Sequence, residues 1–109
     1  HRPWGKFDLI LNEKNSKIKK ITVKPKSELS YQSHKYRNEH WIVLKGIATI
    51  KKNGKTFKIK KDESTYIAKG DKHRLINNEN MDLEIIEVQT GVKVSEKDII
   101  RYDDIYGRN

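Results

Sequence analysis

The chain has 109 residues, enough for one domain with one hydrophobic core and too few for two. It contains no cysteine, which excludes disulfide frameworks and thiolate metal sites, so histidine, carboxylate or amide groups must bind any metal. No stretch approaches the ~18 consecutive apolar residues of a membrane span, and the first residues lack the apolar core of a signal peptide. We therefore expect a cytoplasmic protein without a membrane partner.

The charge distribution favours solvated strand faces over a nucleic-acid interface. Lys and Arg number 24 against 15 Asp and Glu, a formal net charge of +9. The lysines alternate with apolar residues, as in 17–21 and 55–60, and acidic residues interrupt the basic runs. An oligonucleotide-binding barrel would instead gather cations and aromatic residues on one surface, so we expect no nucleic-acid partner. A phosphate pocket needs only two or three cations.

Short runs of alternating β-branched or aromatic residues fill most of the chain, and turn residues separate them. Asn53-Gly54 is the strongest turn signal, because a type I′ hairpin needs positive φ at both central positions. Ser95 followed by Asp98 predicts a helix start and one short C-terminal helical turn. The pattern predicts an all-β sandwich, barrel or jelly roll in one domain, 1–109. The expected strands are 7–11, 18–23, 29–36, 40–45, 47–51, 56–60, 65–68, 73–76 and 83–88.

Two turn-bounded segments, 32–41 and 70–74, hold three of the four histidines. On a continuous strand Gln32, His34 and Tyr36 point to the same face and would line a barrel interior. Burying an amide, an imidazole and a phenol is costly unless each finds a partner. A divalent metal is such a partner, so these segments predict a metal site.

A turn at Arg37-Asn38 would restart the alternation, so that either Glu39 or His40 faces inward, but not both. We favour Glu39, because two imidazoles, one carboxylate and one amide form a donor set that leaves a position open for catalysis. Zinc is the expected ion, with Mn, Fe, Co or Ni as alternatives. The predicted metal ligands are Gln32, His34, Glu39 and His73.

The spacing of these residues resembles the two cupin motifs. Residues 34–46 follow the first motif, which is His-x-His, then Glu, then Gly after six residues, although Tyr36 stands at the second histidine. Residues 68–77 follow the second motif, with its histidine at His73 and its asparagine at Asn77, although alanine replaces the motif's proline. The resemblance implies the cupin double-stranded β-helix, a jelly-roll barrel.

Residues 32–46 more narrowly resemble the signature of type II mannose-6-phosphate isomerases, a cupin domain often fused behind mannose-1-phosphate guanylyltransferase. Residues 2–5, 70–74 and 98–108 agree, so the resemblance covers essentially the whole chain. It implies a metal-dependent isomerase that interconverts mannose 6-phosphate and fructose 6-phosphate in GDP-mannose metabolism. The guanylyltransferase's nucleotide-binding loop is absent from this sequence, so this chain cannot make GDP-mannose by itself.

That reaction needs a Lewis acid, a proton-transfer base and cations for the phosphate. We favour Arg37 for the phosphate, because its planar fork suits that anion. His40 is the candidate base, which requires that it and not Glu39 face inward. Tyr36 stands where the motif has its second histidine. This position therefore decides whether the isomerase centre is intact or modified. The predicted catalytic residues are Arg37 and His40, and the predicted substrate-binding residues are Lys35, Tyr36, Arg74 and Arg101.

Several alternatives remain open at this stage. The alternative to an isomerase is a non-catalytic or epimerase-like cupin that binds a sugar phosphate. Trp4 and Trp41 are expected in the core, the alternative being a wall on which the sugar stacks. An exposed edge strand of a small barrel favours a homodimer.

Overall fold

The computed structural model describes residues 2–103, and these residues form strands and turns only. No helix long and apolar enough to cross a membrane occurs among them. The all-β prediction is confirmed. The strands are β1 (Gly5–Asn12), β2 (Ser16–Val23), β3 (Ser27–Glu28), β4 (Tyr31–Ser33), β5 (Arg37–Lys45), β6 (Ile47–Lys52), β7 (Lys55–Lys60), β8 (Ser64–Ile67), β9 (His73–Asn77), β10 (Leu83–Gly91) and β11 (Ile100–Asp103).

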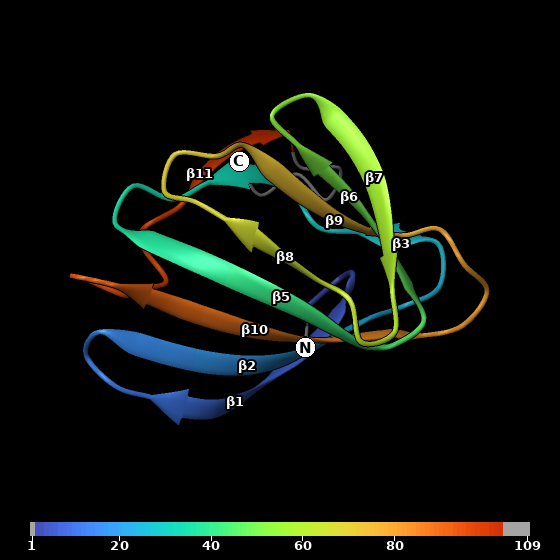
Figure 1. The fold of residues 1–109 in the computed structure, drawn as a ribbon, viewed down its shortest axis with the longest axis horizontal. Coiled ribbons are helices and arrows are strands. Elements are labelled where there is room, and N and C mark those ends of the chain that lie inside the picture. The colour runs from blue at the N-terminus through green and yellow to red at the C-terminus, as the bar shows by residue number, and fades with distance from the viewer. Residues whose placement is uncertain (1, 104–109) are drawn as a thin grey trace.

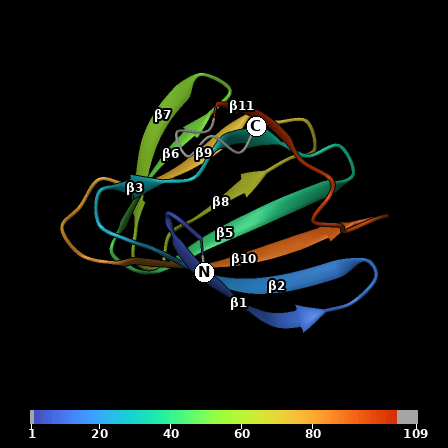
Figure 2. The same ribbon diagram turned by 180° about the vertical axis from the view of Figure 1, so that it is seen from behind.

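The strands form two antiparallel sheets that face each other (Figures 1 and 2). One sheet has the order β1-β2-β10-β5-β8, and the other has the order β11-β4-β9-β6-β7 with β3 paired to β9. Neighbouring strands in each sheet are often far apart in sequence, as for β2 with β10 and β6 with β9. The chain therefore crosses between the two sheets rather than completing one before the other. This is the jelly-roll arrangement that the sequence predicts.

The core lies between the sheets, where alternate residues of each strand point inward. On β2 the inward apolar residues are Ile21 and Val23, and on β10 they are Leu83 and Ile85. Their outward neighbours are mostly polar, as expected for a strand with one solvated face. The whole buried apolar cluster comprises Trp4, Ile21, Val23, Trp41, Val43, Ala48, Ile50, Ile59, Ile67, Leu75, Leu83 and Ile85, which confirms both tryptophans as core residues.

The β6–β7 hairpin turns where the sequence predicts. Asn53 and Gly54 have φ values of 50° and 83°, and Lys52 pairs with Lys55 across the turn. Both central residues are therefore left-handed, which is the type I′ requirement.

The expected continuous strand 29–36 is wrong. The chain instead forms β3 and β4 and then bends at Lys35 and Tyr36. The bend is stabilised from a distant part of the sequence, because the two carboxylate oxygens of Asp98 accept hydrogen bonds from the backbone N–H groups of Lys35 (2.8 Å) and Tyr36 (2.9 Å). The alternation therefore restarts two residues earlier than predicted, at Arg37 and not after Arg37-Asn38.

The predicted helical turn at residues 95–98 is also absent. The segment makes one tight turn, in which Asp98 N donates to Ser95 O at 3.1 Å, and then enters β11. The side chains of Glu96 and Asp98 are engaged elsewhere, with Lys19 and with the bend at Lys35, and these contacts hold the segment against the barrel. The remaining residues of the closing run, 104–108, lie outside the described residues.

Replacing Asn77 should destabilise the fold. Its buried amide nitrogen donates to the backbone carbonyls of Val23 (3.0 Å), Lys24 (3.1 Å) and Met81 (2.8 Å), so it ties β9 to the end of β2 and the turn before β10. Asn77→Ala leaves these acceptors without their donor and should lower the free energy of unfolding by about 2–3 kcal/mol in a urea titration.

The matched control for Asn77 is Asn80→Ala, since Asn80 is exposed in the same turn region. The control should unfold at the wild-type urea concentration. Equal midpoints for the two variants would show that these three hydrogen bonds do not stabilise the barrel.

Candidate functional site

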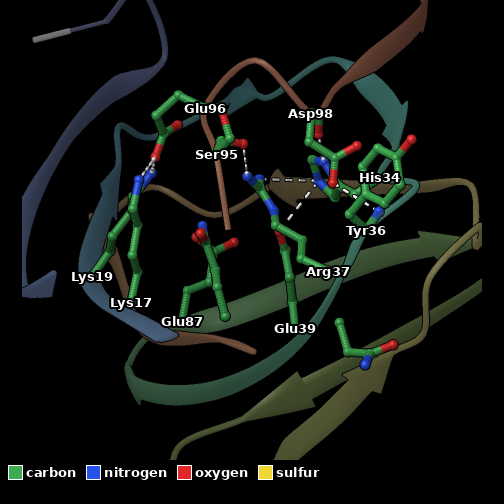
Figure 3. Close-up of polar contacts among 12 residues, drawn as sticks. Lys17, Lys19, His34, Tyr36, Arg37, Glu39, Glu87, Ser95, Glu96 and Asp98 are labelled. Atoms are coloured by element: carbon green, nitrogen blue, oxygen red, sulfur yellow. Dashed lines mark hydrogen bonds and ion pairs between the residues drawn. The ribbon is translucent and has the colours of Figure 1, made fainter. Parts of the chain in front are cut away.

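A cavity of about 170 Å³ lies between the two sheets. Its walls come from β1, β2, β4, β5, β9, β10 and β11, together with the segment 92–99 that leads from β10 to β11. The volume suits a small ligand. Figure 3 shows this segment, with Ser95, Glu96 and Asp98, lying above the side chains that rise from the sheets.

Two imidazoles face one carboxylate in the wall of the cavity. His34 Nε2 lies 3.2 Å from Glu39 Oε2, and His73 Nε2 lies 3.9 Å from Glu39 Oε1. All three side chains are buried, and one ligand atom of each lies within 4.8 Å of the others. Metal–ligand bonds of about 2.0–2.2 Å place ligand atoms about 3–4 Å apart. The three residues therefore form a group that can hold a divalent metal.

A backbone carbonyl orients each imidazole. His34 Nδ1 lies 2.6 Å from Asp98 O, and His73 Nδ1 lies 3.0 Å from Asp71 O. A carbonyl oxygen can only accept, so we assign the proton of each ring to Nδ1, which leaves the lone pair of Nε2 directed toward Glu39. Metal-binding histidines are commonly held in this way by a partner of the second ring nitrogen.

The electrostatics keep both rings in the neutral form that binds metals. Burial and the charge of Arg37 lower the pKa of His34 to about 4. Burial likewise lowers the pKa of His73. No proton must therefore leave either ring at neutral pH before a metal binds.

Gly70 precedes His73 in the turn that leads into β9 and has a φ of 84°, a left-handed conformation that suits glycine. Gln32 lines the cavity and lies opposite His73 in the β4–β9 pairing. The four predicted ligands thus reach one cavity from three places in the sequence: the end of β4, the start of β5 and the start of β9.

Arg37 lies beside the ligand group. Its Nε donates to Glu39 Oε2 at 2.9 Å, its Nη1 to Ser95 O at 2.9 Å, and its Nη2 lies 3.3 Å from His34 Nε2. Each of its three nitrogens is therefore engaged in the wall of the site. The sequence suggests a phosphate-binding role for Arg37, but in the structure it joins the segment 92–99 to the ligand group.

The other cations predicted to help bind phosphate are dispersed. Arg101 lines the cavity. Arg74 is on the far side of β9, where it pairs with Glu28 at 3.5 Å and donates to Asp103 O at 2.8 Å. Lys35 is exposed in the bend that follows His34.

Tyr36 and His40 both point away from the cavity. Tyr36 is 39% exposed and borders a second hollow with Lys35, whose Nζ lies 5.4 Å from the centre of the Tyr36 ring. His40 is exposed on the outer face of β5, with its ring centre 4.6 Å from that of Tyr66. Adjacent residues of a strand point to opposite faces, and Glu39 faces inward. His40 therefore faces outward and cannot act as the base that the sequence predicted.

Glu87 on β10 is a buried carboxylate in the cavity wall that sequence reasoning missed. Trp41 Nε1 donates to both Glu87 Oε1 (3.1 Å) and Glu39 Oε1 (3.0 Å), while Gln89 Nε2 donates to Glu87 Oε2 (2.8 Å). Burial and repulsion from the Glu39 carboxylate raise the pKa of Glu87 to about 8. The cavity thus holds a carboxyl group able to take up or release a proton near neutral pH.

The residues flanking Glu87 contained the signal that would have found it. Leu83 and Ile85 have the same parity on β10 and belong to the core, so Glu87 faces the same way. On β2, Lys19 points to the same face as Ile21 and is also buried. Lys19 and Glu87 are paired in the β2–β10 register, which places the amine beside the carboxyl group.

The family described as mannose-6-phosphate isomerase C-terminal matches residues 1–104. This chain belongs to that family. The family resemblance predicted from the sequence is therefore confirmed.

Two curated relatives and one solved structure illustrate the similarity. The alginate biosynthesis protein AlgA of Pseudomonas aeruginosa is 46% identical over 108 residues, which cover 99% of this chain and 22% of that protein. A mannose-1-phosphate guanylyltransferase of Salmonella montevideo is 45% identical over 109 residues, covering 100% of this chain and 23% of that protein. The chain thus spans about a quarter of the length of these relatives.

A double-stranded β-helix protein from Klebsiella pneumoniae superimposes with a TM-score of 0.81 at 16% identity, covering 93% of this chain and 86% of that one. At this identity the likeness concerns the fold alone. It confirms the predicted cupin double-stranded β-helix.

Proposed function

We propose that this chain is a metal-dependent aldose–ketose isomerase that interconverts mannose 6-phosphate and fructose 6-phosphate. One observation carries the proposal: the ligand group of His34, Glu39 and His73 shares a small cavity with a separate carboxyl group, Glu87, that can exchange protons. Membership of the mannose-6-phosphate isomerase C-terminal family supports the choice of substrate.

The chain's own residues account for binding and proton transfer. A bound divalent metal supplies Lewis-acid polarisation of the substrate's oxygens, and we propose zinc on His34, Glu39, His73 and Gln32, with Mn, Fe, Co or Ni as alternatives. Glu87 takes the proton from C2 of the aldose and returns it to C1. The hydroxyl proton of O2 ends on O1, so no atom is gained or lost. Because His40 faces outward, we assign the base to Glu87.

We further propose that the chain works as the isomerase portion of a longer bifunctional protein of GDP-mannose synthesis. The relatives reported above are about four times as long and include a mannose-1-phosphate guanylyltransferase. An isomerase joined to such an enzyme would form mannose 6-phosphate, and a mutase would then convert it into the mannose 1-phosphate that the guanylyltransferase uses.

A coupled assay of fructose 6-phosphate formation from mannose 6-phosphate tests the proposed activity. Metal-loaded protein should turn over, chelator-treated protein should not, and adding Zn²⁺, Mn²⁺ or Fe²⁺ should restore the rate. Binding of mannose 6-phosphate without turnover by the metal-loaded protein would instead identify a non-catalytic sugar-phosphate-binding cupin.

A further inference from the structure

Lys19 is a buried cation that faces the cavity. Its side chain is only 6% exposed, and its Nζ lies 4.3 Å from the centre of the Phe7 ring. Nζ donates to Glu96 Oε1 at 2.5 Å. A lysine is almost never this buried unless it is paired, so its position depends on an anionic partner.

The partner of Lys19 is held less firmly than Lys19 itself. Glu96 belongs to the segment 92–99, and its side chain is 53% exposed although the lysine that it binds is buried. The same oxygen lies 3.6 Å from Nζ of Lys17, the preceding inward residue of β2. A carboxylate that bridges two lysines from the solvent side can be exchanged for another anion at small cost.

Two more cations line the same cavity. Arg2 lies over the Phe7 ring at 5.3 Å, on the ring that Lys19 also approaches. Arg101 lines the cavity as well, and its buried Nε has no hydrogen-bond partner among the described residues. The cluster suits an anion with more oxygens and more charge than one carboxylate, as a phosphate has.

We propose that Lys19 anchors the phosphate of the substrate, with Arg2 and Arg101 as neighbours, and that the Glu96 carboxylate occupies this phosphate site until the substrate displaces it. The inference rests on the proposed function for the identity of the substrate. Arg37 is not assigned this role, since its Nε and Nη1 already donate to Glu39 Oε2 and to Ser95 O.

The position of Lys19 relative to the ligand group fits a 6-phosphate. Across the sheet Lys19 pairs with Glu87, and Glu87 pairs with Trp41, whose ring nitrogen also binds Glu39. Glu87 therefore lies between the anchoring lysine and the ligand group, as Figure 3 also shows for Lys19, Glu87 and Glu39. In a hexose 6-phosphate the reacting carbons C1 and C2 are at the opposite end from the phosphate, with the base required near C1 and C2.

Binding of inorganic phosphate, mannose and mannose 6-phosphate to metal-loaded protein by calorimetry tests the inference. Glu96→Gln removes the competing charge, so inorganic phosphate and mannose 6-phosphate should both bind about fivefold tighter, while mannose should be unaffected. Lys19→Met should weaken binding of both phosphates at least about tenfold, and Lys19→Arg should restore most of it. Wild-type or weaker phosphate affinity in Glu96→Gln would overturn the proposal.

The chain offers a matched control on the opposite face of the same strand. Lys20 pairs with Glu84 at 3.2 Å, outside the cavity. Glu84→Gln and Lys20→Met break an equivalent ion pair and should leave phosphate affinity unchanged.

If phosphate binding follows this pattern but no isomerase activity is found, the anion site stands and the proposed function fails. If the isomerase is active and Glu96→Gln binds phosphate as the wild type does, only the anion site fails.

Discussion

Protein carrying His34→Ala or His73→Ala should lose its bound metal. Each substitution removes one of the two imidazoles that face Glu39, and the other ligands cannot fill the gap because a carbonyl fixes the remaining ring. Removing only an outer partner of a metal-binding histidine lowers affinity about 10–100-fold, so loss of the ring itself should cost more. Elemental analysis after dialysis should find about one metal ion per wild-type chain and nearly none in either variant.

His40→Ala provides the control for metal content. His40 is near His34 in sequence but lies on the outer face of β5, against Tyr66. The variant should retain its metal, and circular dichroism should report the same β content for all three proteins. Full metal occupancy in His34→Ala would place the ion elsewhere and remove the basis of the proposed reaction.

Glu87→Gln should nearly abolish isomerisation while the metal stays bound. Glutamine keeps the shape of the side chain and can still accept the hydrogen bond from Trp41, but it cannot carry a proton between C2 and C1. Loss of a positioned acid–base group typically lowers the rate about 10²- to 10⁴-fold, and we expect kcat to fall in that range with KM little changed.

A second readout separates proton transfer from a structural effect of Glu87→Gln. In D₂O the wild type should introduce deuterium from solvent at C1 of fructose 6-phosphate, since the carboxyl group exchanges its proton during the reaction. The variant should show no incorporation, whereas Glu84→Gln, from the outer face of the same strand, should behave as the wild type. Normal turnover in Glu87→Gln would assign the base to another group.

The ligand group was within reach of sequence reasoning, because local spacing determined most of it. His73 begins β9 after a turn, Glu39 is the third residue of β5, which also follows a turn, and strand parity directs both side chains inward. The Asn-Gly hairpin and the alternating core strands are likewise local features. These elements need no knowledge of which strands lie side by side.

The features that were missed depend on contacts distant in sequence. Tyr36 turns outward because Asp98 binds the backbone of the bend, and nothing near Tyr36 predicts that contact. The helix signal at Ser95 fails because Glu96 binds Lys19, a residue on another strand. Glu87 and Lys19 had a local signal, since both interrupt an inward apolar series, but only the cavity gives a reason for charge at those positions.

The segment 92–99 touches both ends of the cavity. Through Glu96 it reaches Lys19, and through the carbonyl of Asp98 it orients the imidazole of His34. A ligand that moves this segment must therefore change the affinity of the site at the other end, and thermodynamic linkage makes the effect reciprocal. On the proposals made above, the sugar phosphate and the metal would each change the affinity of the site for the other, through a segment that performs no chemistry itself.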